Sequence, residues 1–273
     1  MGLLIFREAF IVCPIKTNYP LAFHMLTRSL NLFYDSALAL VYPQACHVCG
    51  ASVESRAHGF ACGKCWLETR IFTEAQAMCW KCGKVSRGRV PDEQREVLRC
   101  LSCDEFCFTA ARACGVYEKA LRASVLSLKR QPHLPRRLAE VLVSAAKRVP
   151  LEHCTRIIPV PLHPERERAR GFNQAEIIGQ EVSKRIGLPL DHVSLFRTVH
   201  TDRHRAGMDA KARRETVEDA FAVRYPHLIA GESILLVDDV LTTGATASSC
   251  ASALLNAGAK EVFVLTIARP LDY

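Results

Sequence analysis

The sequence predicts an α/β protein in which a parallel sheet is flanked by helices and preceded by a small cysteine-rich module. From about residue 108, strand patterns alternate with helical patterns, which is typical of a doubly wound sheet. The run SILLVDDV (233–240) is almost continuously apolar up to its two acids, as expected of a parallel strand covered on both faces. Eight of the thirteen cysteines form four C-x-x-C pairs between residues 46 and 103, a spacing that indicates metal binding.

The composition is that of an ordinary globular chain. Its 273 residues are 49% hydrophobic and 23% charged, which suits one large domain with a small added module. The net charge of +8 points to anionic partners such as phosphates or nucleic acid, although charge alone does not define a fold. The start MGLLIFREAFIVCP is interrupted by Arg7 and Glu8, so it is a poor secretory signal and too short to span a membrane. We therefore expect a cytoplasmic protein without a membrane span.

The first 45 residues divide into two segments. We interpret residues 1–28 as a disordered leader, and we take residues 1–24 to be dispensable because Met25 offers an alternative start. SLNLFYDSALALVYP has apolar residues at helical spacing and stops at a proline, so residues 29–45 are predicted to form an amphipathic helix.

The first half of the alternating region predicts a strand and two helices. RACGVYE (112–118) has the pattern of a short strand. KALRASVLSLKR (119–130) has apolar residues at three- and four-residue spacing and ends before Pro132. RRLAEVLVSAAKRV (136–149) is a second helix, closed by Pro150.

The second half contains one helix with clear boundary signals. Asn173 can act as its N-cap, Glu176 follows three residues later, and Gly187 can end it. The other predicted elements are the strands RIIPVP (156–161), DAFAV (219–223), SILLVDDV and KEVFVLTIAR (260–269), and the helix ATASSCASALLNAGA (245–259).

The cysteine pairs predict two structural zinc sites. Zinc prefers four thiolates in a tetrahedron with bonds of about 2.3 Å, and two C-x-x-C knuckles supply such a set. Residues 46–104 lack long apolar runs, so this segment cannot build a core of its own and needs a cross-link such as a bound metal to fold. The short linkers favour sequential pairing of the knuckles; the alternatives are a cross-braced pairing, metal-free thiols or redox-active pairs. The predicted ligands are Cys46, Cys49, Cys62, Cys65, Cys79, Cys82, Cys100 and Cys103.

Two adjacent acids at the end of a buried strand predict a ligand site. Ligands of open α/β sheets bind at the carboxyl ends of the strands, which is where Asp238 and Asp239 stand. The turn TTGAT then opens a helix, whose backbone N–H groups and dipole favour an anion. The carboxylates can accept hydrogen bonds from hydroxyl groups, and the turn beside them can donate hydrogen bonds to a phosphate. A sugar phosphate needs both. The alternatives are acids that face water, or a response-regulator receiver, which the 34 residues after Asp239 are too few to complete.

The stretch ILLVDDVLTTGAT resembles the phosphoribosyl-pyrophosphate (PRPP) signature of type I phosphoribosyltransferases. IIPVPLHPERERARGFNQA (157–175) resembles a segment of the ComF family, the GntX/ComFC-like proteins, in which a double zinc ribbon precedes a phosphoribosyltransferase domain. The resemblance covers residues 30–270 and implies a double zinc ribbon at 46–104 and a type I phosphoribosyltransferase-like domain at 108–273. It implies that Asp238 and Asp239 hold the ribose hydroxyls. The 5′-phosphate would be held by Thr242, Thr243, Gly244, Ala245 and Thr246.

Three arginines are candidates for binding the pyrophosphate. Arg166, Arg168 and Arg170 lie between a proline and a glycine, in what we predict to be a mobile loop that closes over the site. Guanidinium groups suit phosphate oxygens, but a solvated charge run paired with the neighbouring glutamates is an equal alternative. Lys129, at the end of an earlier helix, is a weaker candidate for the same role.

The resemblance implies two alternative functions. As an enzyme, the protein would bind PRPP with Mg²⁺ and transfer the phosphoribosyl group to an unknown acceptor, with Asp238 and Asp239 favouring positive charge on the sugar. As a non-catalytic competence factor for DNA uptake, it would bind single-stranded DNA or protein partners. The segment 201–221 would form the hood that contacts the acceptor in related enzymes. It departs from the family pattern at Arg205 and Thr216, so the resemblance does not identify the acceptor.

Overall fold

The structure, a computed structural model, describes residues 44–271 except 75, 87–90, 92–93, 102 and 199–219. Nearly all of the predicted leader, the amphipathic helix and the hood segment therefore lies outside the described residues. In the part of the chain that is described, no helix is long and apolar enough to cross a membrane.

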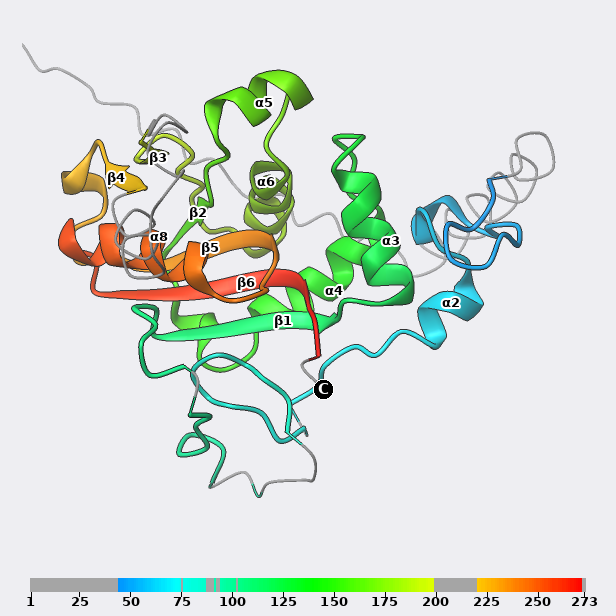
Figure 1. Ribbon diagram of the computed structural model, residues 1–273, viewed down its shortest axis with the longest axis horizontal. Coiled ribbons are helices and arrows are strands. Elements are labelled where there is room, and N and C mark those ends of the chain that lie inside the picture. The colour runs from blue at the N-terminus through cyan, green and yellow to red at the C-terminus, as the bar shows by residue number, and fades with distance from the viewer. Residues whose placement is uncertain are drawn as a thin grey trace, which may run out of the picture.

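Four parallel strands form the central sheet, as the alternating pattern predicts (Figure 1). Their order is β1 (Ala110–Val116), β6 (Glu261–Arg269), β5 (Ser233–Val240) and β2 (Arg156–Pro159). The central strands are β5 and β6, and most of their side chains are buried on both faces. This double burial explains why both strands are nearly continuous apolar runs.

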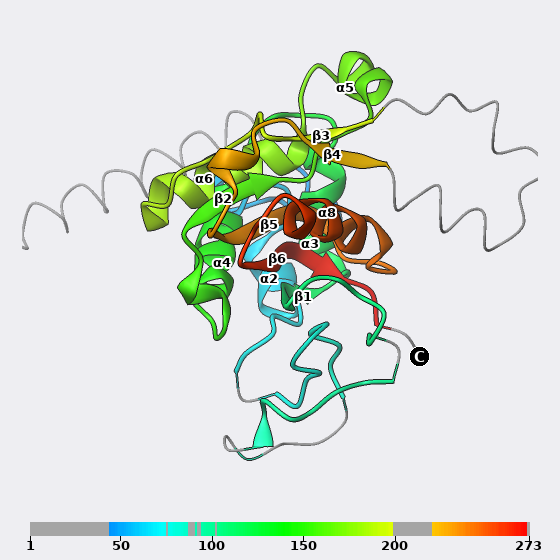
Figure 2. The ribbon, with the colours of Figure 1, turned by 90° about the vertical axis from the view of Figure 1, so that its left-hand side faces the viewer.

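Helices cover both faces of the sheet (Figure 2). One face shares a hydrophobic core with α3 (Lys119–Leu128), α4 (Arg136–Ala146) and α6 (Gln174–Ile186). The other face packs against α8 (Ala245–Asn256). The predicted α/β class, with a parallel sheet between helices, is confirmed.

Local signals set the ends of α6. The Asn173 side chain accepts a hydrogen bond from the Ala175 N–H at 3.0 Å, and Gly187 ends the helix in the left-handed conformation. Both boundaries agree with the prediction. Shorter helical elements are η1 (Arg56–His58), α2 (Gly63–Leu67), η3 (Leu151–His153), α5 (Pro164–Arg170) and η5 (Pro226–Leu228).

One predicted strand lies outside the parallel sheet. DAFAV forms β4 (Phe221–Val223), which pairs antiparallel with β3 (Leu195–Arg197) in a separate two-stranded sheet. Only the first residue of β4 is buried, and the strand packs against α8. A strand this short and half exposed does not have the two covered faces that a central parallel strand requires.

The cysteine module covers the open edge of the sheet at β1. The Phe72 N–H donates to the Cys114 carbonyl at 2.8 Å, and the Ala111 N–H donates to the Lys81 carbonyl at 2.6 Å. An edge strand otherwise presents unpaired backbone groups that promote aggregation. The sheet therefore depends on the module for a closed edge.

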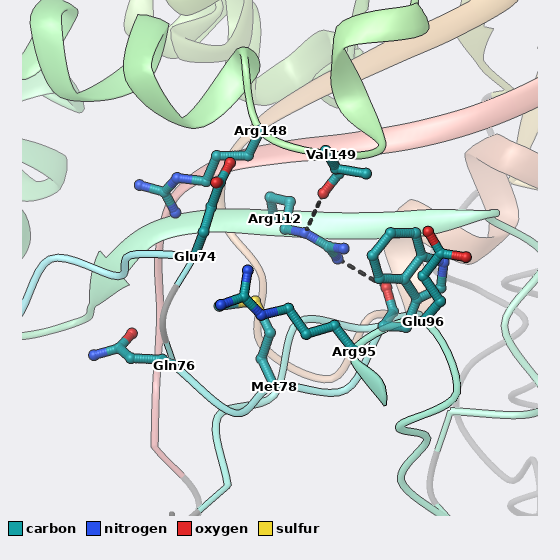
Figure 3. A pocket seen from close by; sticks show the side chains of 9 residues that line it. Glu74, Gln76, Met78, Arg95, Glu96, Arg112, Arg148 and Val149 are labelled. Atoms are coloured by element: carbon teal, nitrogen blue, oxygen red, sulfur yellow. Dashed lines mark hydrogen bonds between the residues drawn. The ribbon is translucent and has the colours of Figure 1, made fainter. Parts of the chain in front are cut away.

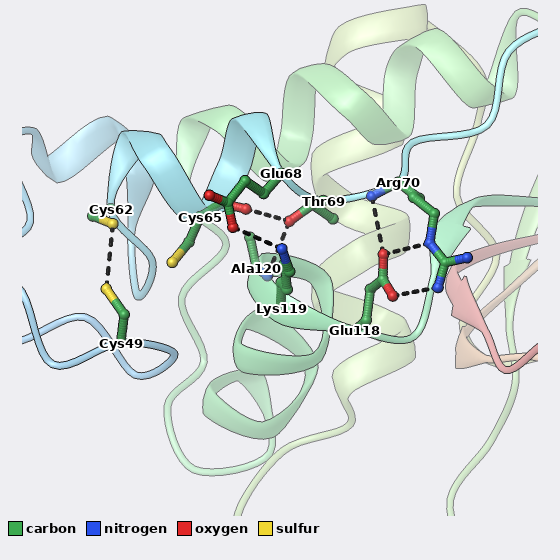
Figure 4. A network of polar contacts seen from close by, with 9 residues as sticks. All are labelled: Cys49, Cys62, Cys65, Glu68, Thr69, Arg70, Glu118, Lys119 and Ala120. Atoms are coloured by element: carbon green, nitrogen blue, oxygen red, sulfur yellow. Dashed lines mark hydrogen bonds and ion pairs between the residues drawn. The ribbon is translucent and has the colours of Figure 1, made fainter.

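Polar contacts fasten the first half of the module to the start of α3 (Figure 4). The Arg70 guanidinium donates two hydrogen bonds to the Glu118 carboxylate, at 2.7 and 2.5 Å. The Lys119 ammonium lies 2.7 Å from the Glu68 carboxylate. These pairs are partly exposed to solvent, which screens them, so each adds little to stability. The Thr69 hydroxyl adds a cap, because it accepts a backbone N–H from the first turn of α3 at 3.1 Å.

Arg112 fastens the second half of the module to the sheet (Figure 3). It is only 4% exposed, and it donates to the carbonyls of Val149 at 3.1 Å, Trp80 at 2.8 Å and Ala111 at 2.9 Å. Burial lowers the pKa of Arg112 to about 10, so the guanidinium is charged at neutral pH. Its charge also lies over the Trp80 ring, 5.0 Å from the ring centre, beside a cavity of about 170 Å³.

Candidate functional site

The predicted zinc ligands form two clusters, each made of two consecutive C-x-x-C pairs. Within each cluster the four sulfur atoms lie within 4.8 Å of one another, so sequential pairing is confirmed and the cross-braced alternative is wrong. In one cluster the sulfur–sulfur distances include 3.4 and 3.5 Å, close to the edge of about 3.8 Å in a tetrahedron with Zn–S bonds of about 2.3 Å. The first cluster is Cys46, Cys49, Cys62 and Cys65, and the second cluster is Cys79, Cys82, Cys100 and Cys103.

Hydrogen bonds favour the charged form of one thiol in each cluster. Burial raises the pKa of the Cys46 thiol, but backbone N–H donors, above all that of Cys62, outweigh it and lower the pKa to about 6. A hydrogen bond with the Cys82 side chain is the main cause that lowers the pKa of Cys79 to about 4. Thiolates are the form that binds zinc, and four of them leave no open coordination position. Both clusters therefore fit a structural zinc ion.

The acid pair lies at the carboxyl end of β5, where both side chains are partly buried. The Asp239 N–H donates to Asp238 Oδ1 at 2.7 Å, and Lys129 Nζ lies 3.0 Å from Asp239 Oδ2. Burial, together with the neighbouring Asp239 carboxylate, raises the pKa of Asp238 to about 7. At neutral pH the site therefore combines an acid that is paired with Lys129 and an acid that is close to half-protonated.

The predicted phosphate turn, Thr242–Thr246, follows the acid pair and opens α8. Asp238, the turn and Thr266 of β6 together line a small cavity of about 30 Å³. Thr266 stands opposite Asp238 in the register of the two central strands. The N-terminus of α8, whose dipole favours an anion, therefore adjoins the acid pair.

Gly244 is required for a reason that the sequence does not reveal. A glycine in a phosphate-binding turn can leave room for close approach of the phosphate. In the structure Gly244 has a φ of +81°, and a Cβ built there would lie 2.7 Å from the ring of Phe106. Phe106 follows the last ligand of the second cluster, far from the turn in the chain. No local pattern signals this contact.

The three candidate arginines do not lie on a loop. They belong to α5 (Pro164–Arg170), which has a proline in its first turn and ends at Gly171 in the left-handed conformation. Arg166 and Arg168 are exposed, and α5 stands outside the layers formed by the sheet and α6 (Figures 1 and 2). Among the described residues, no hydrogen bond or ion pair joins Arg166, Arg168 or Arg170 to the acid pair or the turn. The prediction of a mobile loop is wrong, because the bracketing proline and glycine mark the two ends of a helix.

Lys129 is the cation that the structure brings to the acid pair. The sequence ranks it below the arginines, because only its place at the end of a predicted helix links it to the site. It forms the C-cap of α3 and pairs with Asp239. Its side chain is 38% exposed, so the ammonium remains accessible to a ligand.

Comparison with known proteins defines the class. Residues 37–104 match the double zinc ribbon domain family, and residues 173–272 match the phosphoribosyl transferase domain family. The chain therefore carries a double zinc ribbon followed by a phosphoribosyltransferase domain. The two cysteine clusters agree with the first match, and the parallel sheet with flanking helices agrees with the second.

Homologues with related names confirm the predicted resemblance to the ComF family. Competence protein F of Haemophilus influenzae is 33% identical over 50% of this chain and 61% of its own length. The DNA utilization protein YhgH of Escherichia coli O157:H7 is 36% identical over 49% of this chain and 57% of its own length. Competence protein ComFC of Bacillus subtilis is 32% identical over 41% of this chain and 44% of its own length. The matched segments thus span less than two thirds of these relatives.

Proposed function

We propose that the chain binds PRPP, or a related sugar phosphate, together with Mg²⁺ and transfers the phosphoribosyl group to an acceptor. The observation that carries this proposal is the position of Asp238 beside the turn Thr242–Thr246, since the acid and most of the turn line one small cavity. Carboxylates accept hydrogen bonds from ribose hydroxyls, and a helix N-terminus binds a phosphate. The match to the phosphoribosyl transferase domain family supports the same substrate class.

In the proposed reaction the 5′-phosphate lies against the turn, and Asp238 and Asp239 accept hydrogen bonds from the 2′- and 3′-hydroxyls. The bond from C1′ to pyrophosphate breaks, and its electron pair leaves with the pyrophosphate. A lone pair of the acceptor forms the new bond to C1′, and the acceptor loses its proton to water. Positive charge develops on the sugar, where the two carboxylates stabilise it. The acid pair fits Mg²⁺, which binds through one or two carboxylates plus substrate phosphates and would neutralise charge on the pyrophosphate. Lys129 can exchange Asp239 for a phosphate oxygen, because its ammonium is partly exposed.

Calorimetric titration with PRPP and Mg²⁺ tests the site. We expect Asp238→Asn/Asp239→Asn to bind PRPP at least about tenfold more weakly, because amides replace the acceptors of two ribose hydroxyls. Glu152→Gln removes an exposed carboxylate from η3 and serves as the control, with unchanged affinity. Absence of binding to the wild-type protein, or equal binding by the double variant, would contradict the proposal. Pyrophosphate release in the presence of candidate acceptors then tests transfer.

PRPP affinity is expected to rise with pH. The pKa of Asp238 is about 7. Below that pH a proton occupies the carboxylate, which must be free to accept a hydrogen bond from a ribose hydroxyl group. Affinity should increase by up to about tenfold per pH unit below 7 and level off above it. Stability has the opposite trend: the folded state holds this proton more tightly than the unfolded state, so stability falls as pH rises from about 4 to about 7.

Calorimetry between pH 6 and pH 8 measures the affinity slope. Asp238→Asn is the control, because its remaining slope reports only the titration of PRPP itself. The prediction is wrong if wild type and Asp238→Asn have the same slope.

A second candidate function, nucleic-acid binding, is favoured by a basic groove between the first cluster and α3. The groove has a volume of about 420 Å³ and is lined by His47 and Val48 of the first knuckle and by Lys119, Arg122 and Arg130. Arg122 and Arg130 are exposed, and the described residues provide no ion-pair partner for either. Such a groove attracts the negatively charged phosphate backbone of a nucleic acid. The names of the relatives refer to DNA utilization and competence.

Fluorescence anisotropy with a labelled single-stranded oligonucleotide tests this groove. Arg122→Ala/Arg130→Ala should weaken binding and reduce the slope of log K against log salt by about 1.4, the value for two lost phosphate contacts. Arg136→Ala/Arg137→Ala removes two arginines that pair with Glu140 and should leave the slope unchanged. Equal slopes for the groove variant and the wild type would contradict the assignment.

A further inference from the structure

A short segment joins the second zinc cluster to the phosphate turn. This segment, Cys103–Phe108, is called the arm, and both of its end residues are fully buried. Its Cys107 N–H donates to Ser248 Oγ in the first turn of α8 at 3.0 Å. The arm therefore begins at a predicted zinc ligand and makes a hydrogen bond to the helix that the phosphate turn opens.

The ring of Phe106 lies against the turn. It occupies the space of a missing Cβ at Gly244, as the 2.7 Å separation shows. The ring is itself held in place, because it stacks on Phe108 with the ring centres 4.9 Å apart and the planes at 27°. Phe108 is 1% exposed and belongs to the same hydrophobic core as α8. The arm thus presents a fixed surface to the turn.

Few other groups hold the turn from this side. A cavity of about 330 Å³ separates the rest of the second cluster from the turn, and Phe106 and Arg269 are part of its lining. Thr242 and Thr243 are exposed, and the hydrogen bond from the Ala245 N–H to Thr243 Oγ1 lies within the turn itself. The position of the turn relative to the module therefore depends on Phe106 and on the Cys107–Ser248 hydrogen bond.

The first cluster has a different environment. Three of its four cysteines belong to the core on the face of the sheet covered by α3, α4 and α6, and Cys49 is exposed. Three of the four cysteines of the second cluster belong to the core that contains α8. The chain that follows α2, which carries Cys65, contacts α3 through the polar network of Figure 4. The two clusters thus form a matched pair for an experiment, because within the described part of the chain only the second cluster is connected to the turn.

We infer that the arm positions the phosphate turn, so that metal binding at the second cluster, and not at the first, controls the affinity of the turn for phosphate groups. This inference rests on the proposed function for its ligand. A helix N-terminus binds an anion through N–H groups that must be held in place before the ligand arrives. Metal holds Cys103, the arm carries that constraint to Phe106, and Phe106 restrains Gly244. If the metal or the Phe106 ring is lost, the turn is no longer fixed, and part of the binding free energy is used to order it.

The first experiment uses side-chain variants of the zinc-loaded protein. Phe106→Ala should weaken binding of ribose 5-phosphate and of PRPP with Mg²⁺ by about tenfold, the effect of a cost of about 1.4 kcal/mol. Phe106→Leu keeps an apolar group against Gly244 and should recover most of the affinity. Phe60→Ala removes a buried ring beside His47 of the first knuckle and is the matched control, with unchanged phosphate affinity. Equal affinity of Phe106→Ala and wild type would overturn the inference.

The second experiment compares the clusters and does not depend on ligand binding. Cys100→Ser in the second cluster and Cys49→Ser in the first are compared by zinc content and by NMR of the ligand-free protein. Cys100→Ser should shift the amide signals of Gly244, Ala245 and Thr246 and speed their hydrogen exchange, whereas Cys49→Ser should leave them unchanged. Equal changes in both variants, or none in Cys100→Ser, would overturn the inference. If the wild type binds no PRPP, the proposed function fails while these amide signals still decide the role of the arm.

Discussion

Removing zinc with a strong chelator is expected to unfold the cysteine module and to uncover β1. Structural zinc contributes roughly 10–16 kcal/mol in small zinc domains, comparable to the whole stability of a typical domain of about 5–15 kcal/mol. The module has no core of its own, because its two clusters belong to the cores on opposite faces of the sheet. Without zinc, the hydrogen bonds that Phe72 and Lys81 make with β1 should break, and the edge of the sheet should become free.

Hydrogen exchange and light scattering measure this effect. The Ala111 amide, which donates to the Lys81 carbonyl, should lose its protection, and the protein should aggregate through the free edge. Returning zinc before aggregation should restore protection, and adding Mg²⁺ instead should not, because thiolate ligands do not favour it. Full protection of Ala111 in protein proven to be free of zinc would show that the module does not need metal to cover the sheet.

Arg112→Met is expected to lower the free energy of unfolding by about 1–3 kcal/mol, the usual cost of leaving buried polar groups without a hydrogen-bond partner. The variant keeps an unbranched, flexible side chain but leaves the carbonyls of Val149 and Trp80 without this donor in a buried setting. It also removes the guanidinium that lies over the Trp80 ring. These contacts connect the second half of the module, β1 and the end of α4, so their loss should separate the module from the sheet.

Urea unfolding of the zinc-loaded protein gives the comparison. Arg136→Met is the control: this arginine is exposed on α4, and the change should cost less than about 0.5 kcal/mol. Arg112→Lys keeps the charge but not the forked geometry, so it should fall between wild type and Arg112→Met. A loss below about 1 kcal/mol for Arg112→Met would show that the carbonyls find other donors and that Arg112 is not needed.

The elements that could be predicted from the sequence are those with local signals. Asn173 and Gly187 mark the ends of α6 because capping depends on residues within one turn of the helix end. The C-x-x-C pairs predict the two clusters because each knuckle and its neighbour are close in the chain. Asp238 and Asp239 could be placed at the carboxyl edge of the sheet because strand, turn and helix follow one another directly.

The error at α5 has a physical cause. A short helix made of charged residues has no apolar stripe, so hydrophobic periodicity gives no signal for it. The proline and glycine at its ends are also loop residues, so the same pattern favours both interpretations. The DAFAV strand has a similar limit: its pattern predicts a strand but not its partner, β3, from which residues 199–219 separate it in the chain.

The sequence by itself determined the order of a zinc-binding module and an α/β domain, the cysteines of each cluster and the position of the acid pair before the turn Thr242–Thr246. Only the tertiary structure decided that Lys129, and not the arginines of α5, pairs with Asp239, and that Phe106 restrains Gly244. It also decided that the module closes the sheet at β1. The physical reason is that these contacts join segments far apart in the chain. They arise when apolar surfaces pack into shared cores, and no local spacing of residues encodes which distant groups then meet.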